Sequence, residues 1–153
     1  MDHINIHHTL SDGFDADFCT GEIKNSVFSN TGNDGMDFSG SQITIGGTRI
    51  DNAGDKGISV GEDSSVKVWN AHITNSNIGV ASKDLSFLSI FYIKMEDCVT
   101  GYAAYQKKPE FGPGKIEVET EIVNGNKYPY QIEVGSSLKI GQKVIYGKGG
   151  IEI

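Results

Sequence analysis

A repeat of apolar residues every 22 or so positions is the feature that most constrains how this 153-residue chain can fold. The column of recurring residues is Ile6, Phe28, Ile50, Ile73, Met95, Ile122 and Ile145. A fixed period of this length is typical of solenoids, in which each coil buries its apolar face only by stacking on its neighbours. We therefore expect about six stacked coils of about 22 residues each.

Two further columns keep the same period. Two positions after the apolar column stand short polar residues, which we expect to hydrogen-bond along the stack: His8, Asn30, Asn52, Asn75, Asp97 and Asn124. A third column consists of glycines that precede short strands: Gly13, Gly35, Gly57, Gly79 and Gly101. At these glycines we expect turns with a positive φ.

Alternation after each glycine predicts the strands. In Met36-Asp37-Phe38, for example, the first and third residues are expected to point inward and the middle one outward. Another strand per coil is expected to begin near Ile23, Ile43, Val66, Leu88, Ile116 and Leu138. We therefore predict an all-β fold, a right-handed parallel β-helix with three short strands per coil and three parallel sheets, forming a single domain over residues 1–153. A β-sandwich would also contain short strands, but it would not explain the repeated columns.

Composition and charge exclude several classes of partner. Twenty glycines against three prolines describe a chain that turns often. The formal net charge of −7, without a basic stretch interleaved with aromatic residues, argues against nucleic acid as a partner. No stretch approaches the roughly 20 apolar residues of a membrane span, so no membrane insertion is expected, and the first residues do not resemble a signal peptide.

One coil is longer than the others, and the repeat begins and ends without obvious caps. The step from Met95 to Ile122 is 27 residues, which predicts a projecting loop at 105–115. No amphipathic helix precedes Ile6, and no polar coil follows Ile145. We therefore expect a fragment or carboxy-terminal part of a longer solenoid, with end-to-end self-association possible through uncapped coils.

Four aspartates form the most promising candidate site. The 22-residue period stacks Asp34 on Asp12 and Asp37 on Asp15, at about 5 Å between adjacent coils. Such carboxylates repel each other unless a cation or a shared proton intervenes, and hard oxygen ligands suit Ca²⁺. The alternative is that each aspartate beside a turn glycine caps its own backbone.

The same stretch resembles the polygalacturonase family of β-helix glycosidases, over roughly residues 11–83. Leu10-Ser11-Asp12-Gly13 and Gly32-Asn33-Asp34-Gly35 look like two of its acidic motifs, whereas the positions of its histidine and arginine motifs hold neither residue. The resemblance implies a hydrolase or a Ca²⁺-dependent lyase of acidic polysaccharide. The catalytic candidates under that alternative are Asp12, Asp34, Asp37, Lys56 and Lys83.

A closer resemblance extends to about residue 116. Ser11-Asp-Gly-Phe-Asp-Ala-Asp, Asn33-Asp-Gly-Met-Asp-Phe-Ser and Gly57-Ile-Ser-Val-Gly-Glu look like bacterial right-handed β-helix repeat regions, which are often found on large surface or secreted proteins. It implies a non-catalytic segment of a secreted or cell-surface protein, acting as a rigid structural or carbohydrate-binding module. Asp15, Asp37, Ser59 and Lys83 would form the ligand-binding face, with calcium or no cofactor.

Histidine, cysteine and aromatic residues provide weaker candidates. His3, His7 and His8 could hold zinc, although His8 belongs to the polar column. Cys19 and Cys98 fall about four coils apart, too far for a disulfide, so both are predicted to be free thiols. Four aromatic residues could stack on sugar rings or fill the core: Trp69, Tyr92, Tyr102 and Tyr105.

Overall fold

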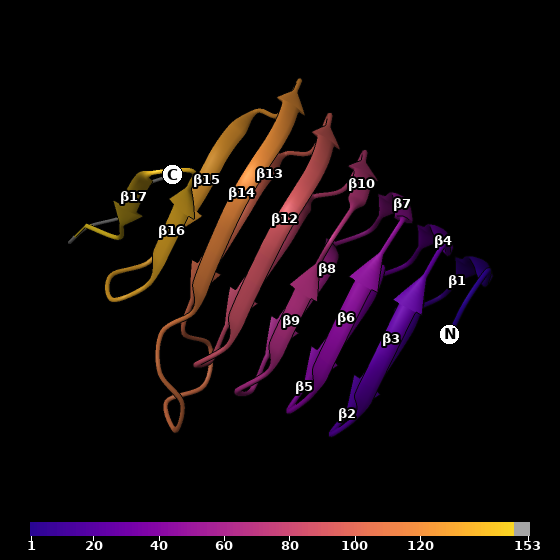
Figure 1. Cartoon of the computed structure of the whole chain (residues 1–153), viewed down its shortest axis with the longest axis horizontal. Coiled ribbons are helices and arrows are strands. Elements are labelled where there is room, and N and C mark those ends of the chain that lie inside the picture. Colours follow the sequence, from indigo (N-terminus) through magenta and orange to yellow (C-terminus); the bar gives the residue numbers. More distant parts are fainter. Residues whose placement is uncertain (149–153) are drawn as a thin grey trace.

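The chain forms a β-solenoid whose coils follow one another in sequence order along the long axis (Figure 1). The computed structural model describes residues 1–148, so residues 149–153 at the end of the predicted 1–153 domain lie outside the described residues. All regular elements of the described part are strands, and none of its segments is a helix with the length and hydrophobicity of a membrane span. The all-β prediction is therefore confirmed.

One sheet takes a single strand from each coil. Its strands pair in parallel in the order β2-β5-β8-β11-β13-β15, at a separation of about 22 residues for all pairs except β13 and β15, which are 28 residues apart. Their bounds are β2 Phe14–Asp17, β5 Met36–Ser39, β8 Lys56–Gly61, β11 Ile78–Lys83, β13 Thr100–Tyr105 and β15 Tyr128–Ile132. The first five of these are the strands predicted after the glycine column, whereas β15 was not predicted.

The other strands join into one larger sheet, which has two branches in the first coils. One branch contains β1 Asn5–Thr9, β4 Val27–Thr31, β7 Thr48–Ala53 and β10 Ala71–Thr74. The second contains β3 Thr20–Lys24, β6 Gln42–Gly46 and β9 Ser65–Val68. Both branches meet at the long strand β12, Phe87–Glu96, which pairs with β14, Lys115–Asn124. Three strands per coil are thus correct for the early coils, but three separate sheets are not, because β12 and β14 continue straight through the corner.

Alternation within the strands builds a continuous core. Met36 and Phe38 are fully buried, as are Ile58 and Val60 in the next coil, which confirms their predicted inward direction. Along the first branch of the larger sheet, Phe28, Ile50 and Ile73 stack in register and are likewise fully buried. Burial of apolar surface on this scale is the main term that stabilises the fold.

The left-handed backbone lies in the polar column and not in the glycine column. His8, Asn30, Asn52, Asn75 and Asp97 have φ between 53° and 57°, because short polar side chains tolerate this region. The prediction of positive φ for the glycine column was wrong. Those glycines are required by close approach: a Cβ on Gly57 would lie 2.6 Å from the carbonyl oxygen of Gly79.

Two register assignments were also wrong. Met95 pairs with Val123, and Ile122, placed in the core by the repeat, faces solvent. Asn124 is likewise replaced by Gly125 at the left-handed corner, where φ is 73°. At the other branch Ile23 pairs with Ile45. Ile23 still points inward, because a shift by two positions keeps a side chain on the same face of a strand.

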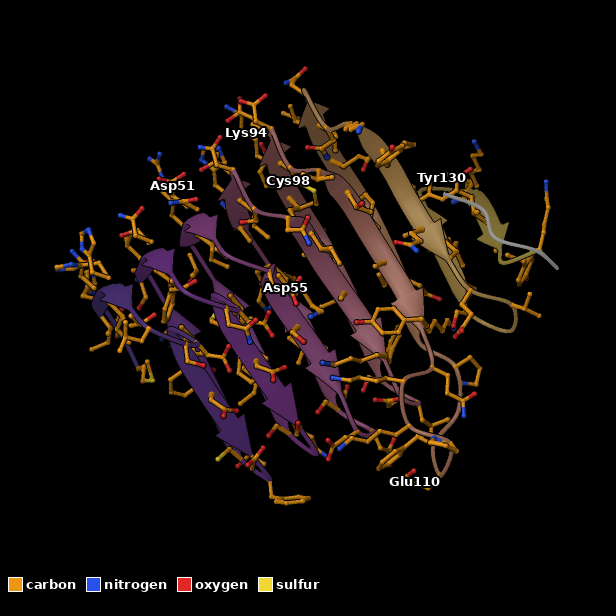
Figure 2. All side chains as sticks on the ribbon, turned by 180° about the vertical axis from the view of Figure 1, so that it is seen from behind. Asp51, Asp55, Lys94, Cys98, Glu110 and Tyr130 are labelled. Carbon is orange, nitrogen blue, oxygen red and sulfur yellow. The ribbon has the colours of Figure 1, made fainter. Side chains whose placement is uncertain are left out.

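The predicted loop at 105–115 connects β13 to β14 and is tied to its neighbours. The backbone N–H groups of Lys107 and Lys108 both donate to Asp84 Oδ1, at 2.6 and 2.7 Å. The ammonium group of Lys108 also pairs with Glu62. Glu110 lies near the outer edge of this loop (Figure 2). The loop therefore extends from the stack but is held at its base.

The two ends of the stack differ. At the amino-terminal end the edges of β1 and β2 have no strand partner among the described residues. At the other end β17, Lys143–Tyr146, pairs antiparallel with β16, Ser137–Ile140, so Ile145 does not continue the parallel column. The repeat had placed Ile145 in the parallel column, and that assignment is wrong, because β17 runs antiparallel to its neighbour.

Candidate functional site

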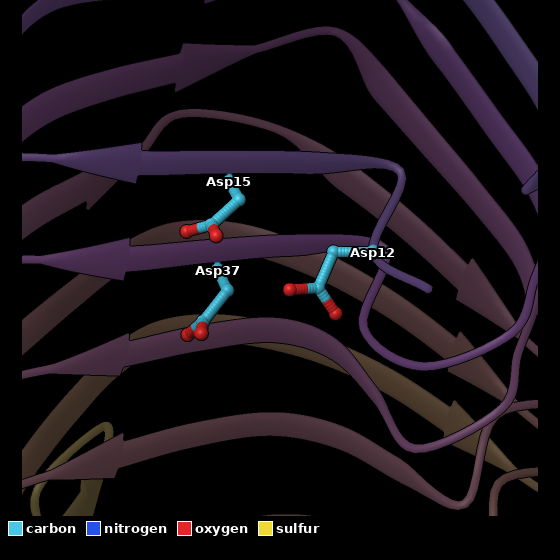
Figure 3. A group of neighbouring side chains, drawn as sticks. All are labelled: Asp12, Asp15 and Asp37. Carbon is cyan, nitrogen blue, oxygen red and sulfur yellow. The ribbon is translucent and has the colours of Figure 1, made fainter. Parts of the chain in front are cut away.

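Three aspartate carboxylates converge at the amino-terminal end of the six-stranded sheet. Asp15 and Asp37 are direct neighbours on β2 and β5, and Asp12 lies in the turn before β2. One carboxylate oxygen from each falls within 4.8 Å of the other two. Figure 3 shows Asp15 and Asp37 one above the other on neighbouring strands, with Asp12 beside them. The predicted stacking of Asp15 and Asp37 is confirmed.

Outward alternation places Asp15 and Asp37, since the inward positions of the same strands are occupied by Phe14, Ala16, Met36 and Phe38. Burial raises the pKa of Asp15 above its usual range, and the charges of Asp17, Asp37 and Asp12 raise it further. At Asp37, Oδ1 is buried and accepts no hydrogen bond from the described residues. Its nearest cation is Lys83 Nζ, at 3.9 Å. The cluster therefore concentrates negative charge that the protein itself does little to neutralise.

Asp34 has a different role from its three neighbours. Its side chain is 2 % exposed, and Oδ1 accepts a hydrogen bond from the Lys56 backbone N–H at 3.0 Å. Burial raises the pKa of Asp34 to about 6, despite that hydrogen bond and the nearby Lys56 ammonium. Asp34 lies outside the convergent group. Asp34 thus satisfies a backbone N–H group, as the alternative interpretation expects, but that group belongs to the next coil and not to its own turn.

Asp12 combines both roles. Its Oδ1 accepts hydrogen bonds from the backbone N–H of Asp34 at 2.9 Å and from Asn33 Nδ2 at 2.8 Å. A carboxylate has further acceptor sites, so these two bonds leave Asp12 able to contribute an oxygen to a cation.

Lys56 is engaged within the protein. Its Nζ donates to Asp55 Oδ2 at 2.5 Å and lies 3.7 Å from Asp34 Oδ1. Burial disfavours the charged form of Lys56, but the hydrogen bond to Asp55 and the charge of Asp34 raise its pKa overall. A lysine with a raised pKa is a poor general base at neutral pH.

Ser59 and Lys83 lie on the same sheet as the aspartates, but both residues are buried from solvent. Ser59, directly beside Asp37, is fully buried, and its hydroxyl has no hydrogen-bond partner among the described residues. Lys83 begins on β11, and its methylene groups would be 2.8 to 3.5 Å from a Cβ added at Gly61 on β8. The Lys83 side chain therefore crosses one coil and ends beside Asp37. The predicted face of Asp15, Asp37, Ser59 and Lys83 is contiguous, but only its aspartates are open to solvent.

Comparison with known proteins provides the family. The model of the family described as "right handed beta helix region" matches residues 1–148. The chain belongs to this family. The match agrees with the parallel solenoid of the described residues, and it supports the resemblance to right-handed β-helix repeat regions. No curated protein and no solved structure gives a significant match to this right-handed β-helix.

Sequence reasoning missed the contribution of Asp55. In this right-handed β-helix Asp55 accepts hydrogen bonds from Lys56 Nζ and from Asn77 Nδ2, and it lies near the middle of the stack (Figure 2). Burial opposes ionisation of Asp55, but the hydrogen bond and charge of Lys56 lower its pKa. The signal was present, because Asn33, Asp55 and Asn77 recur at steps of 22.

The weaker candidates are scattered. Cys19 and Cys98 are free thiols, as predicted. His7 and His8 approach each other to 2.8 Å between Nδ1 atoms, but within residues 1–148 they belong to no group of three metal ligands. Among the aromatic residues, Tyr102 is buried in the core, whereas Trp69 is 57 % exposed.

Proposed function

We propose that this right-handed β-helix is a non-catalytic binding module that holds a divalent cation, Ca²⁺ in the first instance, on Asp12, Asp15 and Asp37. The observation that carries the proposal is the convergence of three carboxylate oxygens within 4.8 Å, together with the buried Oδ1 of Asp37, which accepts no hydrogen bond from residues 1–148. Hard oxygen ligands at this density suit Ca²⁺, and a bound cation would relieve their mutual repulsion.

An acidic polysaccharide is the ligand that best fits such a cation. A Ca²⁺ ion on an exposed face retains coordination positions, and these can be filled by carboxylates of a uronic acid chain. Lys83, beside Asp37, adds a positive charge next to the same position. The rigid stack supplies an extended surface of the kind that solenoids use for binding. A secreted or cell-surface location would give access to such a ligand, and it remains part of the proposal.

A polysaccharide lyase or hydrolase is the alternative function, and the geometry favours it less. A lyase requires an unprotonated base, but Lys56 is held in its charged form by Asp55. A hydrolase requires a protonated acid that the substrate can reach, but Asp34, whose pKa of about 6 suits that role, is 2 % exposed.

Calorimetric titration with Ca²⁺ tests the cation site. We expect the wild type to bind and Asp37→Asn or Asp15→Asn to weaken binding by about tenfold or more, since each removes a ligand and a charge. Asp17→Asn is the matched control, because it removes the same charge from β2 outside the convergent group, and we expect an affinity change of about twofold or less. Equal losses of Ca²⁺ affinity in all three variants would mean that the cation is attracted by a diffuse acidic surface and not held at a specific site.

Affinity electrophoresis in polygalacturonate tests the glycan. We expect retention of the wild type with Ca²⁺, loss of retention with a chelator and loss in Asp37→Asn. Ca²⁺ binding without any retention would leave the cation site standing and reject the polysaccharide.

A further inference from the structure

Trp69 and Phe91 form an exposed aromatic pair on the larger sheet, on different strands from the aspartate cluster. Trp69 follows β9 and Phe91 lies in β12, and their side chains are 57 % and 52 % exposed. The ring centroids are 5.7 Å apart, with planes inclined by 50°. Two large exposed rings in adjacent coils have no role in the core, whose inward positions here belong to Val68 and Ile90.

The pair borders a hollow of about 370 Å³ with polar side chains at its margin. Lys67, Ser89 and Glu119 line it together with the two rings. Within residues 1–148, neither Lys67 nor Glu119 forms an ion pair. The hollow thus offers a cationic donor, a hydroxyl and an anionic acceptor, and the two charges cancel.

The register leaves the platform accessible. The position one coil before Trp69 is Gly46, because Ile45 pairs with Val68. Gly46 itself contributes no side chain beside the indole, and the nearest atom to a Cβ added there would be Lys24 Cγ, at 3.9 Å. In the next coil Glu119 follows Phe91, because Ile90 pairs with Val118. The aromatic pair is therefore flanked by Gly46 in the coil before it and by the hydrogen-bond acceptor Glu119 in the coil after it.

We infer that this aromatic hollow binds an uncharged glycan whose pyranose rings carry equatorial hydroxyls, such as a β-1,4-linked glucan. Such rings expose axial C–H groups on their faces, which pack against aromatic rings, while their hydroxyls require both donors and acceptors at the margin. An acidic chain fits less well, because the two charged groups at the margin cancel. The inference is independent of the cation site, which lies on another sheet.

The single tryptophan of the chain provides the measurement. We expect cellohexaose to shift Trp69 emission to shorter wavelength and to protect the indole from iodide quenching, because the sugar displaces water from its surface. Phe91→Ala keeps the reporter and should weaken the apparent affinity by about tenfold. Phe18→Ala, which removes an aromatic residue that is 82 % exposed in another coil, should leave it unchanged.

Three outcomes would overturn the inference. The first is the absence of any emission change or protection with cellohexaose. The second is protection that is equal in the wild type and in Phe91→Ala. The third is protection that rises with protein concentration in the absence of sugar, which would assign the aromatic pair to contact with a second copy of the chain. Because the titration is repeated with a chelator and with Asp37→Asn, where no change is expected, its result is separate from the fate of the cation proposal.

Discussion

The outer face of the six-stranded sheet changes character between its second and third coils. The same outward column reads Asp15 and Asp37 in the first two coils and Ser59, Ala81 and Ala103 in the next three. The aspartates converge and retain solvent contact, whereas the three small residues are at least 99 % buried.

The inward side of the sheet does not change in this way. Met36, Phe38, Ile58 and Val60 are fully buried on both sides of the boundary. A uniform core therefore supports two different surfaces, an open acidic one and a closed one crossed by Lys83. The scaffold constrains the outward positions little, so a site can be built in two coils without a change in the fold.

Glycine substitutions should have the largest effect on stability. They should also distinguish the acidic section, formed by the first two coils, from the closed section formed by the next three. In the third coil, Gly57→Ala would place a Cβ 2.6 Å from the Gly79 carbonyl oxygen and 2.8 Å from Ile73 Cγ2. We expect it to lower the free energy of unfolding by about 3 kcal/mol, measured by urea denaturation.

Gly13→Ala in the first coil meets similar contacts, with the Gly35 carbonyl oxygen at 2.7 Å. Because that coil has a stacked neighbour on one side only among the described residues, it can relax, and we expect a loss of about 1 kcal/mol. Gly46→Ala, whose Cβ would meet nothing closer than 3.9 Å, is the control and should be close to neutral. Equal losses at Gly13 and Gly57 would contradict the idea that the first coil is the more adaptable.

Asp34, at the boundary of the two sections, should make stability depend on pH. Because burial raises its pKa from 3.8 to about 6, the folded state binds this proton more tightly than the unfolded state does. Its contribution is therefore fully present below pH 3.8 and is lost as the pH rises through 6.

Asp34→Asn keeps an oxygen for the Lys56 N–H but cannot ionise. We expect thermal or urea unfolding to show the variant more stable than the wild type by about 2 kcal/mol at pH 7, with the difference disappearing toward pH 4. Asp63→Asn removes the same charge from an exposed turn and should follow the wild-type profile. A difference that grows toward acid pH would mean that Asp34 is stabilised as a carboxylate.

Lys83→Met should have the smallest effect on stability and a clear effect on the acidic section. Methionine keeps most of the apolar length that crosses Gly61 and removes the charge 3.9 Å from Asp37 Oδ1. We expect unfolding to change by less than about 1 kcal/mol, because the ion pair is long.

Without that charge, Ca²⁺ affinity should rise by about fivefold, because Lys83 competes with the cation for Asp37. Lys139→Met, which removes a lysine from the larger sheet, should leave the affinity unchanged. A loss of affinity in Lys83→Met would show that the lysine orders Asp37 for binding, and the boundary between the two sections would then be part of the site.

The sequence by itself determined the coil, the inward column as far as Met95 and the pairing of Asp15 with Asp37. These follow from a period of about 22 residues combined with alternation along each strand, both of which are properties of the chain alone. The sequence also predicted that Cys19 and Cys98 do not form a disulfide, because the number of residues between two positions of a solenoid gives the number of coils between them.

Only the tertiary structure decided what each column is for. A pattern of glycines does not show whether a glycine is needed for a positive φ or for a close approach of two backbones. In the structure the positive φ occurs in the polar column, whereas Gly57 and the other glycines of its column are needed for close approach. Nor could counting show that Asp34 turns inward to the backbone while Asp37 stays outside, or that Lys83 crosses a coil to reach it. Those outcomes depend on which groups become buried and on how far a side chain extends across neighbouring coils. Both are properties of the assembled stack and not of a single repeat.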